Sequence, residues 1–123
     1  MNILNLMKCD DYKKIRLGKD NDGGYVIYDG LNYDLIIGCG ISNDLSFEED
    51  FVKKYNCKSI VYDGTIKKLP KHSFNHIWKN ENVYQGTLNE LLNNNKNIFL
   101  KMDIEGCEWD FFKNVNLENV SQM

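Results

Sequence analysis

The sequence predicts an α/β domain with a mostly parallel sheet. Short apolar runs of strand length recur along the chain, amphipathic segments separate them, and turns rich in glycine and aspartate follow them. The 123 residues are 42% hydrophobic, which suffices for one hydrophobic core and is too little for two. We therefore expect a single domain over residues 1–123, in which residues 1–30 form a lead-in and a short β element.

The first 30 residues have the weakest pattern. Residues 1–14 predict a short helix or an irregular lead-in. An Asn/Asp/Gly turn cluster then precedes a β-branched and aromatic run, which predicts a strand at residues 24–28. We interpret the basic residues around this turn as a solvated surface, because a net charge of −3 provides no basic field for nucleic acid. These basic residues are Lys13, Lys14, Arg16 and Lys19.

Residues 33–63 have the pattern of a βαβ unit. Residues 33–37 predict a strand that is buried on both faces, and the chain then enters a glycine-containing loop at residues 38–44. Ser46 followed by Glu49 has the spacing of a capping box, which predicts a helix ending near residue 56. A further apolar run predicts a strand at residues 58–62. Two strands joined through a helix imply parallel pairing.

The remainder of the chain continues the alternation of strands and helices. Residues 74–78 and 98–102 predict strands, and Thr87 with Glu90 repeats the capping-box spacing at the start of a short helix through residue 92. A last helix is expected to begin at or just after Gly106. No strand is expected after it, so the predicted parallel sheet has strands at 33–37, 58–62, 74–78 and 98–102.

Several classes of protein are disfavoured by composition. No apolar run approaches the roughly 20 residues that span a bilayer, and the N-terminus lacks a signal-peptide pattern, so we expect a cytoplasmic protein without membrane contact. The four cysteines form no CxxC pair, which indicates neither a disulfide framework nor zinc. His72 and His76 lack an obvious third ligand, so we expect surface or packing roles and no metal.

A glycine loop and a distant acid form the first constellation with chemical meaning. Gly38 and Gly40 follow a buried strand and precede a helix, where glycines let the backbone approach a ligand. Asp63 lies at the end of the next strand, roughly 20 residues later. A carboxylate at this position can accept hydrogen bonds from both hydroxyls of a ribose. The three-glycine pyrophosphate fingerprint is not met, because Ser42 and Asn43 follow where its third glycine would lie. This departure favours an adenosine-type cofactor without phosphates; the alternative is a tight turn without a ligand.

Two carboxylates form the second constellation. Asp103 and Glu105 lie where the strand at residues 98–102 ends and a helix is expected to begin, the position at which open parallel sheets hold their ligands. The alternative is structural: Asp103 caps the helix and Glu105 complements its positive end. The sequence leaves both interpretations open.

Two segments of the sequence form a recognisable signature. They are Thr87-Leu-x-Glu-Leu-Leu and the frame Lys-x-Asp-x-Glu-Gly-x-Glu that begins at Lys101. This signature resembles that of the FkbM-type S-adenosylmethionine-dependent methyltransferases. Arg16-Leu-Gly, Asp22-Gly-Gly-Tyr25, Gly38-x-Gly and Ser46-Phe-Glu48 further resemble the branch related to the methyltransferase-like proteins of animals. The resemblance covers most of residues 15–115.

The resemblance implies a Rossmann-like methyltransferase fold, in which residues 31–123 form the cofactor-binding part. The implied cofactor is S-adenosylmethionine, with Gly38, Cys39, Gly40, Asp63 and Asp103 as its binding residues. Two departures are evident. Ile36 stands where related enzymes often carry an acid, and the family fold continues for several more strands. We therefore expect the fold to be incomplete.

The implied reaction is methyl transfer to an oxygen of a small molecule or sugar. Asp103 is the first candidate for a base or for positioning the acceptor, and Glu105 is the second. Asp22 and Tyr25 are weaker candidates for lining the pocket, the alternative being a hairpin turn. Expected partners are a small-molecule or glycan acceptor, no nucleic acid, and either self-association or a missing C-terminal part. The rival functions are a non-catalytic S-adenosylmethionine-binding module and another nucleotide-binding α/β enzyme.

Overall fold

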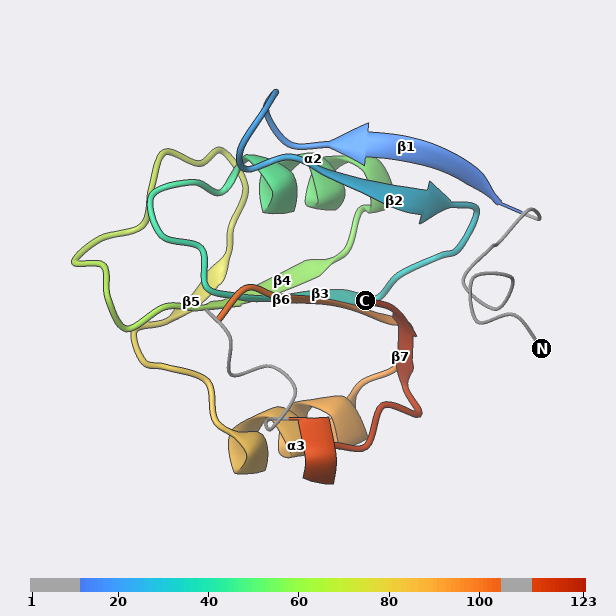
Figure 1. Cartoon of the computed structure of the whole chain (residues 1–123), viewed down its shortest axis with the longest axis vertical. Coiled ribbons are helices and arrows are strands. Elements are labelled where there is room, and N and C mark those ends of the chain that lie inside the picture. The colour runs from blue at the N-terminus through green and yellow to red at the C-terminus, as the bar shows by residue number, and fades with distance from the viewer. Residues whose placement is uncertain (1–11, 105–111) are drawn as a thin grey trace.

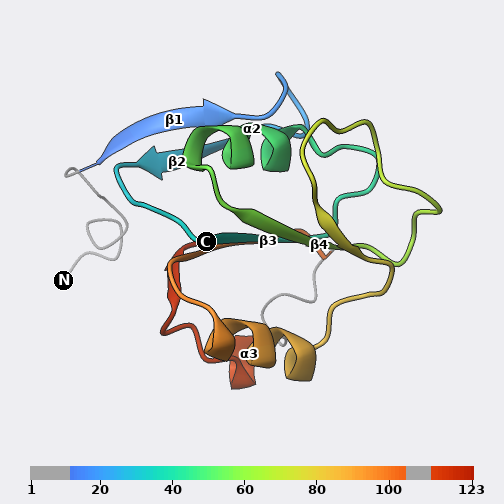
Figure 2. The ribbon, with the colours of Figure 1, turned by 180° about the vertical axis from the view of Figure 1, so that it is seen from behind.

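The computed structural model of the chain describes residues 12–104 and 112–123. These residues form three layers, with a parallel sheet in the middle (Figure 1). Helix α2 (Ser46–Tyr55) and a β hairpin cover one face of the sheet, and helix α3 (Gln85–Asn94) covers the other. The view from behind shows the same layers (Figure 2). The predicted α/β class with a parallel sheet is confirmed.

The central sheet contains β3 (Leu35–Cys39), β4 (Lys58–Tyr62), β5 (Ile77–Lys79), β6 (Ile98–Met102) and β7 (Val120–Gln122). Its strand order is β5-β4-β3-β6-β7, and all neighbours are parallel. Counted along the chain, these strands have the order 3-2-1-4-5, so the order reverses between β3 and β6. This arrangement is compatible with a Rossmann-like fold.

Strand β3 is buried along its whole length because helical and hairpin layers cover both of its faces. Ile36 packs with Phe47, Phe51 and Phe99 on the α2 face. Leu35, Ile37 and Cys39 belong to the cluster that contains Leu88 and Leu92 of α3. A strand that buries both faces shows a continuous apolar run instead of alternation. The predicted strand at residues 33–37 was therefore correct in kind but displaced by two residues.

At the start of the chain, the predicted strand at residues 24–28 is confirmed as β2 (Tyr25–Asp29) within one residue, whereas the predicted helix or irregular lead-in is wrong at residues 13 and 14. Residues 13–17 form strand β1 (Lys13–Leu17), which pairs antiparallel with β2. Leu17 is buried against the α2 face of the sheet, whereas the basic residues of β1 are exposed. The basic cluster is thus the solvated side of a hairpin strand. Residues 1–11 of the predicted lead-in lie outside the described residues.

Both predicted capping boxes were wrong. The N-cap residues of α2 and α3 are Leu45 and Tyr84, and neither makes a side-chain capping hydrogen bond. The Ser46 N–H instead donates to Asp44 Oδ1 at 2.9 Å. Glu49 accepts hydrogen bonds from the backbone of the connection that leads to β5. Within the described ranges, none of the helices is long and apolar enough to cross a bilayer.

The end of the chain also departs from the prediction. Strand β7 pairs parallel with β6 through Ile98 and Phe99, although no strand was expected there. Gln122 ties β7 to the hairpin layer: its side chain donates to the Tyr28 carbonyl and accepts from the Tyr28 N–H. The short sequence Val-Ser-Gln contains no apolar run from which a strand could be predicted. Of the helix expected from Gly106, residues 105–111 lie outside the described part, and Phe112–Asn114 form a 3₁₀ turn, η1.

Candidate functional site

The candidate site lies at the carboxyl ends of β3, β4 and β6. Parallel sheets bind ligands outside these ends, at the point where the strand order reverses. Here that point lies between β3 and β6. The predicted residues Gly40, Asp63 and Asp103 follow these strands directly.

Gly40 is required by a close contact between the ends of β3 and β6. Its φ is +80°, and a Cβ at this position would lie 1.9 Å from the carbonyl oxygen of Asp103. The Asp103 N–H donates to the Cys39 carbonyl at 2.9 Å. The glycine motif therefore brings the backbone of Asp103 against the turn that follows β3.

Gly38 and Cys39 lie inside strand β3. A Cβ on Gly38 would lie 2.9 Å from Oε1 of Glu48, so the missing side chain leaves room for a carboxylate of α2. The Cys39 side chain is fully buried on the α3 face, and this burial raises its pKa to about 12. Only the backbone of Cys39 is thus placed to contribute to the site.

Asp63 organises the loop that follows β3. Its Oδ2 accepts hydrogen bonds from the N–H groups of Ile41 (3.2 Å) and Ser42 (2.7 Å). Its Oδ1 accepts from the N–H (2.8 Å) and hydroxyl (2.6 Å) of Thr65. Burial opposes ionisation, but the hydrogen bonds from Thr65, Ser42 and Ile41 outweigh it, so the pKa of Asp63 is below its ordinary value. These hydrogen bonds occupy the roughly four acceptor sites of the Asp63 carboxylate. The predicted contact between Asp63 and a ribose stays a prediction.

The loop after β3 uses its N–H groups within the protein. Gly40 donates to the Tyr62 carbonyl at 2.9 Å, and Asp44 donates to the Ile41 carbonyl at 3.1 Å. The N–H groups of Ile41 and Ser42 donate to Asp63. A phosphate cradle requires such N–H groups to point at the ligand. The loop therefore lacks the donor arrangement of a pyrophosphate site.

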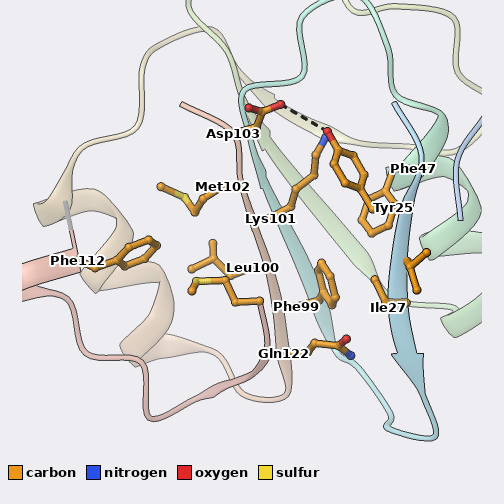
Figure 3. Close-up of a pocket in the computed structure, with 12 residues that line it drawn as sticks. Tyr25, Ile27, Phe47, Phe99, Leu100, Lys101, Met102, Asp103, Phe112 and Gln122 are labelled. Carbon is orange, nitrogen blue, oxygen red and sulfur yellow. Dashed lines mark hydrogen bonds between the residues drawn. The ribbon is translucent and has the colours of Figure 1, made fainter. Parts of the chain in front are cut away.

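Asp103 is exposed and lies near Tyr25 of the hairpin (Figure 3). The Tyr25 hydroxyl is 3.4 Å from Asp103 Oδ2. Burial is the largest cause of the raised pKa of Tyr25; the Lys101 charge lowers this pKa and the Asp103 charge raises it. Tyr25 is thus brought to the site, whereas Asp22 lies in the turn between β1 and β2. Glu105 lies outside the described residues.

A cavity of about 440 Å³ opens beside Asp103, between β2 and β6. Within the described part of the chain, β7 pairs with Ile98 and Phe99 only, so the later part of β6 has no strand beside it on that side. Polar groups in its wall include Lys101 and Asp103, and its apolar wall includes Ile27 and Met102. Asp103 therefore borders both the glycine turn and the cavity.

A buried ion pair supports this wall, and the sequence analysis missed it. Lys101 Nζ is 2.8 Å from Glu48 Oε1, and the side chains are 12% and 0% exposed. The Lys101 Nζ also lies 5.2 Å from the centre of the Tyr25 ring and 5.8 Å from that of Phe47. A sequence signal was present, because Lys101 interrupts the apolar run at residues 98–102 and Glu48 directly follows Phe47.

Two other places in the described structure carry polar side chains: a hollow at the amino ends of β3 and β4, and the surroundings of His76. A hollow of about 530 Å³, partly lined by Asp34 and Lys58, lies at the amino ends of β3 and β4, away from the expected ligand position. Among the described residues, no group of three or more His, Cys, Asp or Glu side chains is arranged to hold a metal ion. The His76 side chain is buried, with Nδ1 2.7 Å from Ser59 Oγ, which is a packing role.

Comparison of the chain with protein-family models, curated proteins and solved structures finds no match. The α/β architecture and the geometry of the site therefore rest on the structure itself.

Replacing Asp63 with asparagine is expected to lower the free energy of unfolding at pH 7 by about 1–3 kcal/mol. Asparagine has one NH₂ group in place of a carboxylate oxygen. In either orientation of the amide, this NH₂ would face an N–H group that donates to Asp63 in the wild type, from Ser42 or from Thr65. Because the folded pKa is depressed, this carboxylate stabilises the fold above the unfolded pKa of about 3.9, and the contribution is lost as pH falls through the folded pKa. Urea unfolding should thus show a difference between wild type and Asp63→Asn that narrows below about pH 4. The exposed Asp20→Asn serves as control, and an equal effect of both variants would contradict the account.

Replacing Lys101 with methionine is expected to cost about 3–5 kcal/mol of unfolding free energy, because it leaves the Glu48 carboxylate buried without a cation. Adding Glu48→Gln should restore a large part of this loss. Urea denaturation of both single variants and the double variant measures the coupling. The exposed Lys58→Met is the matched control. Strictly additive effects of the two substitutions would show that the pair is not a unit.

Proposed function

We propose that the chain is an S-adenosylmethionine-dependent methyltransferase that transfers a methyl group to an oxygen of a small molecule. The observation that carries the proposal is the contact between the glycine turn after β3 and Asp103 after β6, at the reversal of the strand order. The resemblance to FkbM-type methyltransferases adds the reaction class. The strand order fits the Rossmann-like methyltransferase fold that this resemblance implies.

The chemistry of the loop supports a cofactor without phosphates. The N–H groups of the loop donate hydrogen bonds to the carbonyls of Tyr62 and Ile41 and to the carboxylate of Asp63. A pyrophosphate would therefore find few N–H donors in this loop. S-adenosylmethionine instead needs carboxylates and carbonyl groups for its amino group and ribose hydroxyls. This observation weighs against the rival nucleotide-binding enzyme. It also fits a loop in which Asn43 stands at the position of the third glycine of the pyrophosphate fingerprint.

The residues present fit such a cofactor in part. The Asp103 carboxylate would accept hydrogen bonds from its amino group, and the backbone at Gly38, Cys39 and Gly40 would lie along its tail. When bound, the cofactor supplies an electrophilic methyl group. Asp103 also borders the cavity, where it can orient an acceptor hydroxyl and take its proton. Glu105, the second predicted carboxylate, stays a prediction.

On the side of β7, part of β6 has no strand beside it in the described sheet. Strand β7 adds a fifth parallel strand to the predicted four, and its three residues cover only part of β6. We propose that a second copy of the chain completes this side. The departure at Ile36 has a structural reason, since this side chain is fully buried against the α2 layer, where an acid would lie unpaired.

A non-catalytic S-adenosylmethionine-binding module is the second candidate function. Such a module would hold the cofactor at the glycine turn and Asp103. In both candidate functions the predicted ribose contact competes with the hydrogen bonds that Asp63 accepts from Ile41, Ser42 and Thr65. A ribose would have to replace one of these internal donors. Such a module would bind the cofactor and show no methyl transfer in an acceptor screen.

Calorimetric titration with S-adenosylhomocysteine tests the proposal without an acceptor. We expect saturable binding by the wild-type chain and about 10–100-fold weaker binding by Asp103→Asn, because a hydrogen bond to a charged group is worth about 1.5–3 kcal/mol. Asp34→Asn, the same substitution at the amino end of β3, should bind like wild type. Binding of ADP but not S-adenosylhomocysteine by the folded chain would contradict the proposal and favour a nucleotide enzyme.

A further inference from the structure

We propose that the cavity beside Asp103 binds an acceptor with an apolar body and a single hydroxyl group, the chemistry of a hydrophobic phenol and not of a sugar. The inference rests on the proposed function, since it names the substrate class of the same site. It narrows the earlier expectation of a small-molecule or glycan acceptor. Its basis is the distribution of apolar and polar groups around the cavity (Figure 3).

The walls of the cavity are largely apolar. Its apolar lining includes Val26 and Ile27 of β2, Phe99 and Leu100 of β6, and Met123. A volume of about 440 Å³ suits a small ligand. Each sugar hydroxyl placed against such a wall would lose its hydrogen bonds to water, at about 1–3 kcal/mol for an unpaired group. An aromatic or aliphatic body carries no such cost.

The polar groups gather at one end of the cavity. Tyr25, Lys101 and Asp103 lie together there, with the Tyr25 hydroxyl 3.4 Å from Asp103 Oδ2 (Figure 3). Gln122, which also lines the cavity, binds the backbone of Tyr28 and the hydroxyl of Tyr33. The polar end therefore suits one ligand hydroxyl, while the amide of Gln122 already serves the fold.

The charges at this end match the needs of a phenol. Asp103 is an acceptor for the hydroxyl proton. Lys101 has three N–H donors, and its ammonium is held by Glu48 beneath the wall. In the transfer, the ligand oxygen forms a bond to the methyl carbon, the sulfur–methyl bond breaks with its electron pair left on sulfur, and the hydroxyl proton passes to Asp103. The nearby ammonium stabilises the negative charge that develops on oxygen.

Calorimetric titration of the 123-residue chain with 2-naphthol, in the presence and in the absence of S-adenosylhomocysteine, tests this inference. We expect saturable binding of 2-naphthol, at least fivefold weaker binding of 2-methoxynaphthalene, which lacks the hydroxyl, and no binding of methyl glucoside. Asp103→Asn should reduce the preference for 2-naphthol over the ether. A tighter complex with methyl glucoside, or no binding of 2-naphthol, would overturn the inference.

Two substitutions locate the ligand. Val26→Arg should weaken 2-naphthol binding at least tenfold, because an arginine would occupy the cavity from an exposed strand position; Val26 is 59% exposed, so the fold should tolerate it. Met123→Glu is a second lining variant at an exposed position. Ile77→Arg is the matched control, an exposed β-branched residue of β5, and should bind like wild type.

The outcomes separate the two proposals. If 2-naphthol binds in the cavity and S-adenosylhomocysteine does not bind, the ligand class stands and the methyltransferase function fails. If S-adenosylhomocysteine binds and 2-naphthol does not, the function stands and the inferred substrate class fails. Equal weakening by Val26→Arg, Met123→Glu and Ile77→Arg would show that 2-naphthol binds elsewhere, which also overturns the inference.

Discussion

The ion pair between Glu48 and Lys101 is the constraint on which the site depends. It crosses β3 at Gly38, where a side chain would meet the Glu48 carboxylate, and so links α2 to β6. A buried carboxylate needs a compensating partner, and for Glu48 the ammonium of Lys101 is that partner. The pair fixes Lys101 in the cavity wall and thereby the end of β6, where Asp103 follows two residues later. The glycine in β3 is thus explained by charge burial.

Asp63 determines what kind of ligand the turn after β3 can accept. Its carboxylate accepts hydrogen bonds from the N–H groups of Ile41 and Ser42, which holds the loop in one conformation. These two N–H groups are therefore not available to a ligand. The same arrangement that stabilises the turn therefore selects against phosphates. The aromatic and aliphatic cavity lies on the other side of Asp103, so the proposed cofactor and acceptor regions meet at this carboxylate.

The buried centre of the fold was predictable from the sequence because continuous apolar runs identify β4 and β6 at their observed limits. Strands β1 and β7 were not predictable from the sequence, because tertiary contacts determine their pairing. Strand β1 is largely basic, and β7 is a short polar segment anchored through Gln122. The site followed a similar division. Topology placed Asp103 at the reversal of strand order, whereas the partner of Lys101 depends on how α2 packs, which local spacing does not reveal.

Mapping backbone amides by ¹⁵N NMR during titration with S-adenosylhomocysteine tests the central claim most directly. The account predicts saturable shifts at the carboxyl ends of β3, β4 and β6, including Gly40, Ser42 and Asp103, with little change at Asp34 and Lys58 at the amino ends. Saturable shifts confined to the amino ends, or none in a chain with a dispersed spectrum, would contradict it.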